Sequence, residues 1–124
     1  MPPARETEPV GHLLPLKPLH FLMLVSLLDG ERHPYGLKKD LEARDESRLR
    51  LGAGTLYRAI QQLIDAGFIA ESDRRPVREL DDERRTYYRL TTLGRQAAAA
   101  EARRLTALVG SARVKRLVER GETT

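Results

Sequence analysis

The amino-acid sequence predicts a mainly α-helical fold with one small β-hairpin. Apolar residues recur at helical spacing in several stretches of the 124-residue chain, whereas only two short runs are rich in the aromatic and β-branched residues typical of strands. The length suits one domain with its own hydrophobic core. The chain contains no cysteine, which excludes disulfides and thiolate metal sites.

Two helices are expected in the first third of the chain. Residues 16–28 are apolar almost all round, which is typical of a helix buried on most sides, either in a core or between subunits. A second helix is expected over residues 34–46, because proline suits a first helical turn and Leu37 and Leu41 lie one turn apart. Residues 1–15 hold four of the seven prolines, so we expect a flexible arm there.

The third helix, expected over residues 52–66, has the clearest periodicity in the chain. At about 100° per residue one face is apolar, and this face is made of Leu56, Ala59, Ile60, Leu63 and Ile64. The opposite face is made of Gly54, Arg58 and Gln61, with Thr55 and Gln62 beside it. Such side chains can approach or hydrogen-bond a nucleic acid. Gly67 is expected to end the helix as its C′ residue.

A hairpin and a last helix follow. Strands are expected over residues 68–72 and 86–91, and the charged segment between them would form a wing. Thr91 is expected to cap a helix over residues 93–109, and the glycine directly after it should interrupt the helix. The apolar side of this helix is made of Ala98, Leu105, Leu108, Val109 and Ala112.

The order helix, helix, helix, hairpin, helix is that of a winged helix-turn-helix followed by a C-terminal dimerisation helix. We therefore divide the chain into a flexible N-terminal arm (1–15), a winged helix-turn-helix DNA-binding domain (16–92), and a C-terminal dimerisation helix and tail (93–124). The net charge of +4 is a mild indication of a polyanionic partner. Residues 48–62 strengthen this indication, because they contain three arginines and no acid.

Several motifs resemble those of the PadR family of bacterial regulators, in the branch with a short C-terminus. They are Pro34-Tyr35-Gly36-Leu37 in the second helix, Gly54-Thr55-Leu56-Tyr57-Arg58-Ala59-Ile60 in the third, and Arg85-Thr86-Tyr87-Tyr88-Arg89-Leu90-Thr91 followed by Gly94-Arg95 after the wing. The resemblance covers about residues 16–96. It implies a homodimeric regulator of transcription, usually a repressor released by a small molecule, whose last helix packs against the first helix of the partner.

We expect the third helix to act as the recognition helix and to enter the major groove of double-stranded DNA by its N-terminal half. Gly54 would let the backbone come close, Arg58 would read guanine, and Gln61 or Gln62 would read adenine. The expected backbone contacts are Tyr35, Lys38, Lys39, Thr55, Tyr57, Arg84 and Arg85. For each of these residues the alternative is an ordinary solvated surface.

The dimer prediction depends on the first helix, which is apolar all round in a chain that is small to cover it alone. The expected dimer contacts are Leu19, Leu22, Met23, Leu105, Leu108, Val109 and Ala112. The alternative is that the domain itself buries the helix. A dimer would bind a palindromic operator with half-sites about 10 bp between centres. The resemblance alone implies a small aromatic effector between the first and last helices.

Other functions have little support in the sequence. The three histidines share no metal-ligand spacing, the acids form no catalytic pair, and no glycine-rich phosphate loop is present. We therefore expect no enzyme, no cofactor and no metal. No apolar stretch is long enough to span a bilayer and no signal pattern is visible, so we expect a cytoplasmic protein without a membrane partner. The acidic wing tip favours one alternative function, a winged-helix protein–protein interaction module without specific DNA binding.

Overall fold

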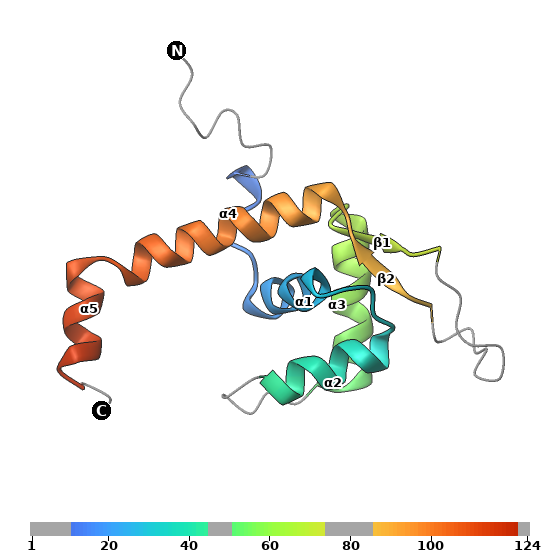
Figure 1. Ribbon diagram of the computed structural model, residues 1–124, viewed down its shortest axis with the longest axis horizontal. Helices are drawn as coiled ribbons and strands as arrows, with labels where there is room; N and C mark the ends of the chain where they lie inside the picture. Colours follow the sequence, from blue (N-terminus) through green and yellow to red (C-terminus); the bar gives the residue numbers. More distant parts are fainter. Residues whose placement is uncertain (1–10, 45–50, 74–85, 122–124) are drawn as a thin grey trace, which may run out of the picture.

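The computed structural model describes residues 11–44, 51–73 and 86–121 (Figure 1). Its elements in chain order are η2 (Gly11–Leu13), α1 (Pro18–Leu28), α2 (Pro34–Arg44), α3 (Ala53–Asp65), β1 (Ile69–Glu71), β2 (Tyr88–Leu90), α4 (Thr92–Val109) and α5 (Ala112–Glu119). The predicted mainly helical fold with a small hairpin is confirmed. Each predicted helix boundary lies within two residues of the observed one, and the two strands are shorter than predicted.

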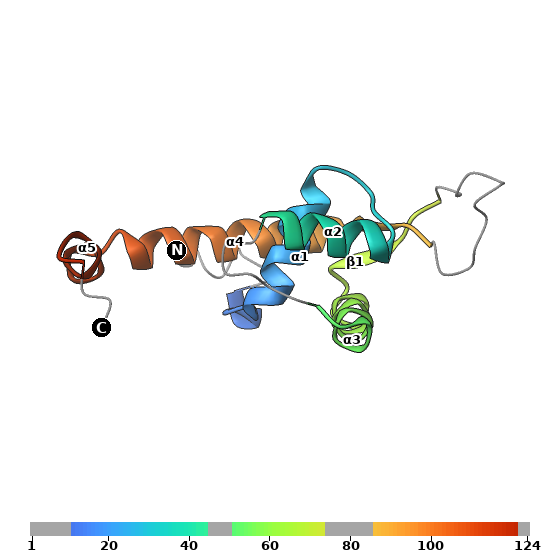
Figure 2. The same ribbon diagram turned by 90° about the horizontal axis from the view of Figure 1, so that it is seen from below.

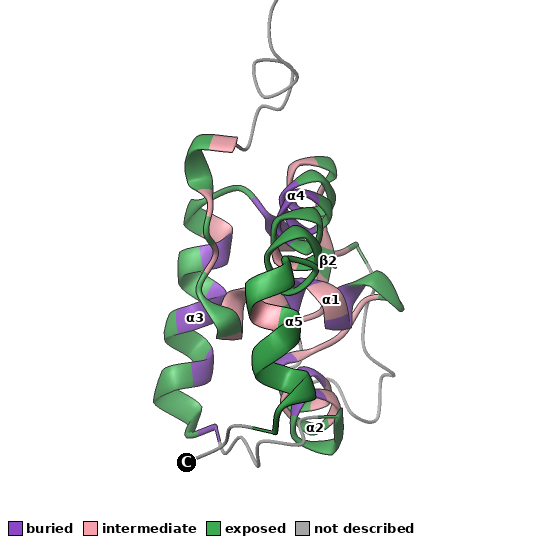
Figure 3. Cartoon of the chain, turned by 90° about the vertical axis from the view of Figure 1, so that its left-hand side faces the viewer, coloured by how far each residue is buried: buried purple, intermediate pink, exposed green. Residues whose placement is uncertain are grey.

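The core lies where α1, α2, α3 and the first half of α4 meet. Met23 and Leu24 of α1 have no exposed surface, and Leu37 of α2 and Leu63 of α3 are 1% exposed. Figure 3 shows the buried positions on the inner sides of α3 and α4, whereas α5 carries none. The apolar first helix is therefore covered largely by its own domain, through contacts with all three other helices of the core.

The start of α3 is anchored to α2 by the buried residue that precedes its N-cap. Leu51 is 5% exposed, and its backbone N–H donates to Glu42 Oε2 of α2 at 3.3 Å. Gly52 then precedes α3 as its N-cap, with no side chain to accept a hydrogen bond. Because Leu51 is fixed in the core, the first turn of α3 has a defined position relative to α2.

The other end of α3 closes in a Schellman motif, as the glycine at position 67 predicts. Gly67 has a φ of 82°, which a residue without a Cβ adopts at no steric cost. Its N–H donates to the carbonyl of Ile64 at 2.9 Å, and the N–H of Phe68 donates to the carbonyl of Leu63 at 3.0 Å. The chain therefore turns directly from α3 into β1.

A third segment pairs with the hairpin, which the sequence did not predict. β1 and β2 pair antiparallel, with Ile69 opposite Leu90 and Glu71 opposite Tyr88. On its other edge, Tyr88 exchanges two backbone hydrogen bonds with Arg32, of 2.8 and 3.2 Å. The link between α1 and α2 is therefore tied to the sheet. The predicted wing loop at residues 74–85 lies outside the described residues.

The start of α4 is held closely against the hairpin. Thr91 Oγ1 accepts a hydrogen bond from the N–H of Gly94 at 3.0 Å, which confirms the predicted cap, and donates to the carbonyl of Gly67 at 2.6 Å. A Cβ on Gly94 would lie 2.0 Å from the carbonyl oxygen of Phe68, so only glycine fits there. α4 then runs beyond the body of the domain, and α5 turns away after Gly110 (Figure 1).

The structure corrects part of the predicted flexible arm. Residues 1–10 lie outside the described residues, but Gly11–Leu13 form a short 3-10 helix against α4, and Leu14 packs against the core. Glu101 of α4, which is 2% exposed, helps to hold this segment because its carboxylate accepts the backbone N–H of Leu16. Arg104 donates to the same carboxylate at 2.7 and 2.8 Å.

Among the described residues, no helix is both long enough and apolar enough to cross a membrane. The same part of the chain brings together no group of three or more histidine or acidic side chains that could hold a metal ion.

Candidate nucleic-acid interface

The outer face of α3 gathers most of the residues that the sequence predicts to contact DNA. Leu56, Ala59, Ile60 and Leu63 are buried, and this inner face fixes the rotation of the helix about its axis. Gly54, Thr55, Tyr57, Arg58, Gln61 and Gln62 are consequently all exposed. Figure 2 shows α3 at one edge of the domain, with its outer side free of other helices.

The backbone of α3 is open to a close approach at Gly54. No heavy atom lies within 4 Å of the position that a Cβ would take on this residue. The packing of the protein therefore does not require glycine at position 54, in contrast to position 94. A glycine in an exposed first turn leaves the helix backbone accessible to a partner.

Arg58 and the two glutamines differ in whether their side chains already make hydrogen bonds within the protein. Within the described part of the chain, Arg58 has no hydrogen bond or ion pair. Gln61 donates from Nε2 to Asp65 Oδ1 at 2.9 Å, and Gln62 accepts at Oε1 from His20 Nε2 at 2.9 Å. Either glutamine must exchange an existing hydrogen bond before it can read a base.

The start of α2 presents a second group of predicted contacts. Tyr35 is 60% exposed, and Lys39 Nζ lies 5.3 Å from the centre of its ring, so the cation and the ring stand together at the surface. Lys38 is half-buried. Arg84 and Arg85, which the sequence also predicts to contact DNA, lie outside the described residues.

The contacts of His33 at the start of α2 were not predicted from the sequence. Its ring Nδ1 accepts the N–H of Gly36 at 3.0 Å and thereby caps the helix. The ring also stacks on Tyr35, with 6.4 Å between centroids, and meets Tyr87 edge to face at 5.3 Å. His33 therefore links the exposed tyrosine of α2 to the strand side of the domain. Its position directly before Pro34, at the expected helix start, is the signal that could have identified it.

A known family matches this architecture. The model of the transcriptional regulator PadR-like family matches residues 23–100, which is more than half of the chain. The chain belongs to the PadR-like family. Its assignment to the branch with a short C-terminus stays a prediction. No curated protein sequence matches it.

Solved structures share the fold of this PadR-like chain at low sequence identity. H. salinarum RosR is 23% identical, with a TM-score of 0.62 over 84% of this chain and 87% of that one. A transcriptional regulator from Clostridium thermocellum is 22% identical, with a TM-score of 0.62 over 73% and 85%. Bacillus subtilis PadR, in a structure with operator DNA, is 23% identical, with a TM-score of 0.57 over 68% and 47%.

The predicted dimer contacts of the PadR-like chain fall into exposed and buried groups. Leu22 is 38% exposed, Leu108 is 51% exposed and Val109 is 57% exposed. Ala112 is exposed, whereas Leu19 and Leu105 are half-buried. The prediction that Met23 is a dimer contact is wrong, because Met23 has no exposed surface and lies in the core of its own chain. A helix that is apolar all round gives no signal of which side faces inward.

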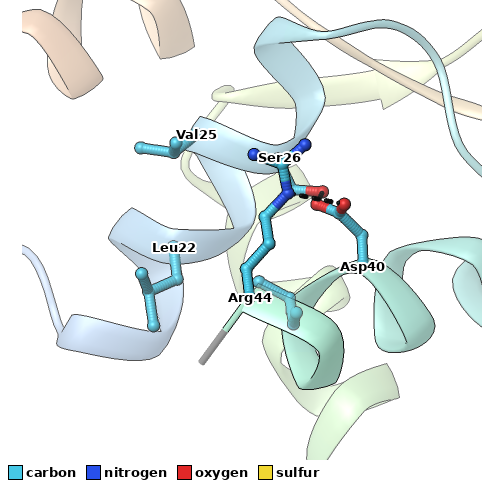
Figure 4. Close-up of a pocket in the computed structure, with 6 residues that line it drawn as sticks. Leu22, Val25, Ser26, Asp40 and Arg44 are labelled. Carbon is cyan, nitrogen blue, oxygen red and sulfur yellow. Dashed lines mark hydrogen bonds and ion pairs between the residues drawn. The ribbon is translucent and has the colours of Figure 1, made fainter. Parts of the chain in front are cut away.

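A small pocket of about 120 Å³ lies between α1 and α2 (Figure 4). Leu22 and Val25 line it on the α1 side, and Asp40 and Arg44 line it on the α2 side. Ser26 donates to Asp40 Oδ2 at 2.5 Å, and Arg44 Nε donates to Asp40 Oδ1 at 2.8 Å. The pocket thus has one apolar wall and one charged wall.

The carboxylate of this pocket is held in its charged form. Burial acts to raise the pKa of Asp40, but hydrogen bonds from Ser26 and Arg44 and the charge of Arg32 together hold the pKa below its ordinary value. Asp40 therefore stays ionised at neutral pH and joins α1 to α2.

Proposed function

We propose that this PadR-like protein is a sequence-specific DNA-binding regulator of transcription whose helix α3 enters the major groove. The observation that carries the proposal is the outer face of α3, where Gly54, Thr55 and Arg58 stand exposed on a helix whose opposite face is anchored in the core. The shared fold with Bacillus subtilis PadR, whose structure contains operator DNA, supports it.

The individual roles follow from side-chain chemistry. Arg58, which has no partner within the described residues, reads guanine through its two parallel donors. Gln61 or Gln62 reads adenine after releasing Asp65 or His20. The backbone contacts, which fix the register of the protein on the duplex, come from Tyr35, Lys38, Lys39, Thr55, Tyr57, Arg84 and Arg85.

We further propose that the protein is a homodimer formed by α1 and α4 of each protomer. Leu22 of α1 and Leu108 and Val109 of α4 expose large apolar side chains, and Leu28 of α1 is also 44% exposed. The second half of α4 runs clear of the domain (Figure 1), so a partner could cover it. Such a dimer would present two α3 helices to a palindromic operator with half-sites about 10 bp apart.

The proposed activity is repression that a small aromatic ligand relieves. The proposed ligand site is the cleft that α1 and α4 would form in the dimer. Leu22 and Val25 line the α1 side of the pocket between α1 and α2, so α1 carries an exposed apolar surface that a ligand would contact. A change in melting temperature or operator affinity on adding phenolic compounds would support the ligand. No response across such a set would contradict it.

Selection of genomic DNA fragments by the purified protein, repeated at several salt concentrations, tests the main proposal. We expect enrichment of one palindrome, lost when Arg58 and Gln61 are both changed to alanine. Lys115→Ala on α5 is the matched control and should keep the enrichment. Weak, salt-sensitive binding without any enriched sequence would contradict the proposal and favour a winged-helix module that docks on proteins.

A further inference from the structure

A hollow of about 190 Å³ lies between α1 and α3, beside the outer face of α3, and Leu19 and Ala59 form the apolar part of its lining. Lys17 and His20 line it from the α1 side, and Thr55, Arg58 and Gln62 line it from the α3 side. Three of these side chains are basic and none of the lining residues is acidic. The hollow is therefore suited to an anion.

The two walls of the hollow are held together. His20 Nε2 donates to Gln62 Oε1 at 2.9 Å, so the imidazole is fixed against α3. Lys17 is the N-cap of α1 and Pro18 follows it, so the first turn of the helix opens beside the lysine. Free backbone N–H groups at a helix N-terminus add to the attraction of an anion. The lysine, the imidazole and the arginine thus converge from two separate elements.

The hollow also has a defined place relative to DNA in the proposed complex. Thr55, Arg58 and Gln62 are three and four residues apart, so they form one stripe along α3. This stripe runs along the edge of the outer face, toward α1. When a helix enters the major groove, its edges face the phosphate backbones that border the groove.

We propose that this hollow binds a phosphate group, held by Lys17 and His20 on the α1 side, while Arg58 on the α3 side keeps its proposed contact with guanine. The source is either a backbone phosphate of bound DNA, which rests on the proposed function, or a free phosphate ion. With a backbone phosphate in place, α1 joins α2 and α3 as a DNA-contacting element. Gln62 then has a different role from the one predicted, because it positions His20 instead of reading a base.

The protonation of His20 provides a readout for this assignment. Burial lowers its pKa, the hydrogen bond with Gln62 acts in the opposite direction, and Lys17 lowers it further. The charged groups that line the hollow around it are Lys17 on α1 and Arg58 on α3. A bound phosphate would offset these positive charges and raise the pKa of His20. The pKa of His20 therefore indicates whether the hollow holds a phosphate.

The first experiment measures binding of the full chain to duplex DNA of arbitrary sequence at several salt concentrations. Fluorescence anisotropy would compare the wild type with Lys17→Gln and with Lys115→Gln, an exposed lysine on α5. Loss of one phosphate contact should reduce the slope of log affinity against log salt by about 0.9. We expect this reduction for Lys17→Gln only, with unchanged melting temperatures.

The second experiment needs no DNA. Sodium phosphate is titrated against the chain at constant ionic strength, with chloride as the balancing salt, and the imidazole signals of the three histidines are followed by NMR. We expect a saturable shift and a raised pKa for His20, weakened several-fold in Lys17→Gln. His12 and His33 serve as internal controls.

The two experiments distinguish a backbone phosphate from a free phosphate ion. They also distinguish failure of this inference from failure of the proposed function. A change in the DNA slope alone supports a backbone phosphate, and a saturable His20 shift supports a site that also takes free phosphate. A wild type without salt-dependent DNA binding refutes the proposed function, and the NMR titration then decides on the hollow. An unchanged slope in Lys17→Gln together with an unresponsive His20 would overturn the inference.

Discussion

Replacing Gly54 by alanine should make the protein more stable and a weaker DNA binder at the same time. In the folded chain no heavy atom lies within 4 Å of the new Cβ, so the substitution meets no clash. Alanine is favoured over glycine in a helix interior by about 1 kcal/mol. The gain at position 54 should be smaller, since the residue lies in the first turn of α3.

The expected loss of affinity comes from the added methyl group at the face that is proposed to approach DNA. If the methyl pushes α3 outward, Arg58 loses its alignment with the base edge, and one such base contact is worth about 1–3 kcal/mol. That corresponds to a loss of roughly 5-fold to 150-fold in affinity. The two effects have opposite signs, so reduced folding cannot explain reduced binding.

Urea denaturation and anisotropy with the selected operator provide the two measurements. The informative comparison is between specific and arbitrary DNA, because the methyl group should weaken the specific complex more. An unchanged operator affinity in a more stable Gly54→Ala variant would refute the close approach of α3 at this residue. A Gly54→Ala variant that is less stable than the wild type would contradict the open space around the Cβ position of Gly54.

Three further predictions concern the framework of the domain. Gly94→Ala should destabilise the fold by about 1–3 kcal/mol in urea denaturation, because its Cβ would lie 2.0 Å from the carbonyl oxygen of Phe68; an unchanged midpoint would contradict this. Leu108→Asp should convert a dimer to a monomer in light scattering without lowering monomer stability, since the side chain is 51% exposed; a persistent dimer would exclude this surface. Arg104 holds the pKa of buried Glu101 below its ordinary value by hydrogen bonds. The carboxylate therefore stabilises the fold above the unfolded pKa of about 4.3. This contribution is lost as the pH falls through the folded pKa. The stability difference between wild type and Glu101→Gln should therefore shrink on acidification, and a constant difference from pH 7 to pH 3 would contradict the ion pair's role.

Helix α3 could be predicted closely because its determinants are local. The apolar stripe that includes Leu56 and Leu63 specifies which face turns inward, and Gly67 specifies where the helix ends. The exposed positions follow from these two facts by geometry alone. Thr91 is predictable for the same reason, since a cap acts on a backbone N–H only three residues away.

The features that the sequence did not predict depend on contacts between distant segments. Arg32 pairs with Tyr88 as a single residue, and one residue shows no strand periodicity. His33 caps α2 through a ring nitrogen, although histidine is not among the preferred capping residues. His20 meets Gln62 from another helix, which no local pattern indicates. Tertiary packing decides each of these contacts.

Helix α1 shows why an apolar helix can still carry several functions. Met23 fills the core, Leu22 faces outward on the proposed dimer surface, and His20 is bonded to α3. α1 also contacts α2, α4 and β2, and packed interiors transmit small displacements because they hold few voids. A ligand or partner that shifts α1 must therefore also disturb the hollow beside α3. The surface proposed for the dimer and the surface proposed for DNA thus belong to one helix, and regulation of DNA binding through α1 needs no further mobile element.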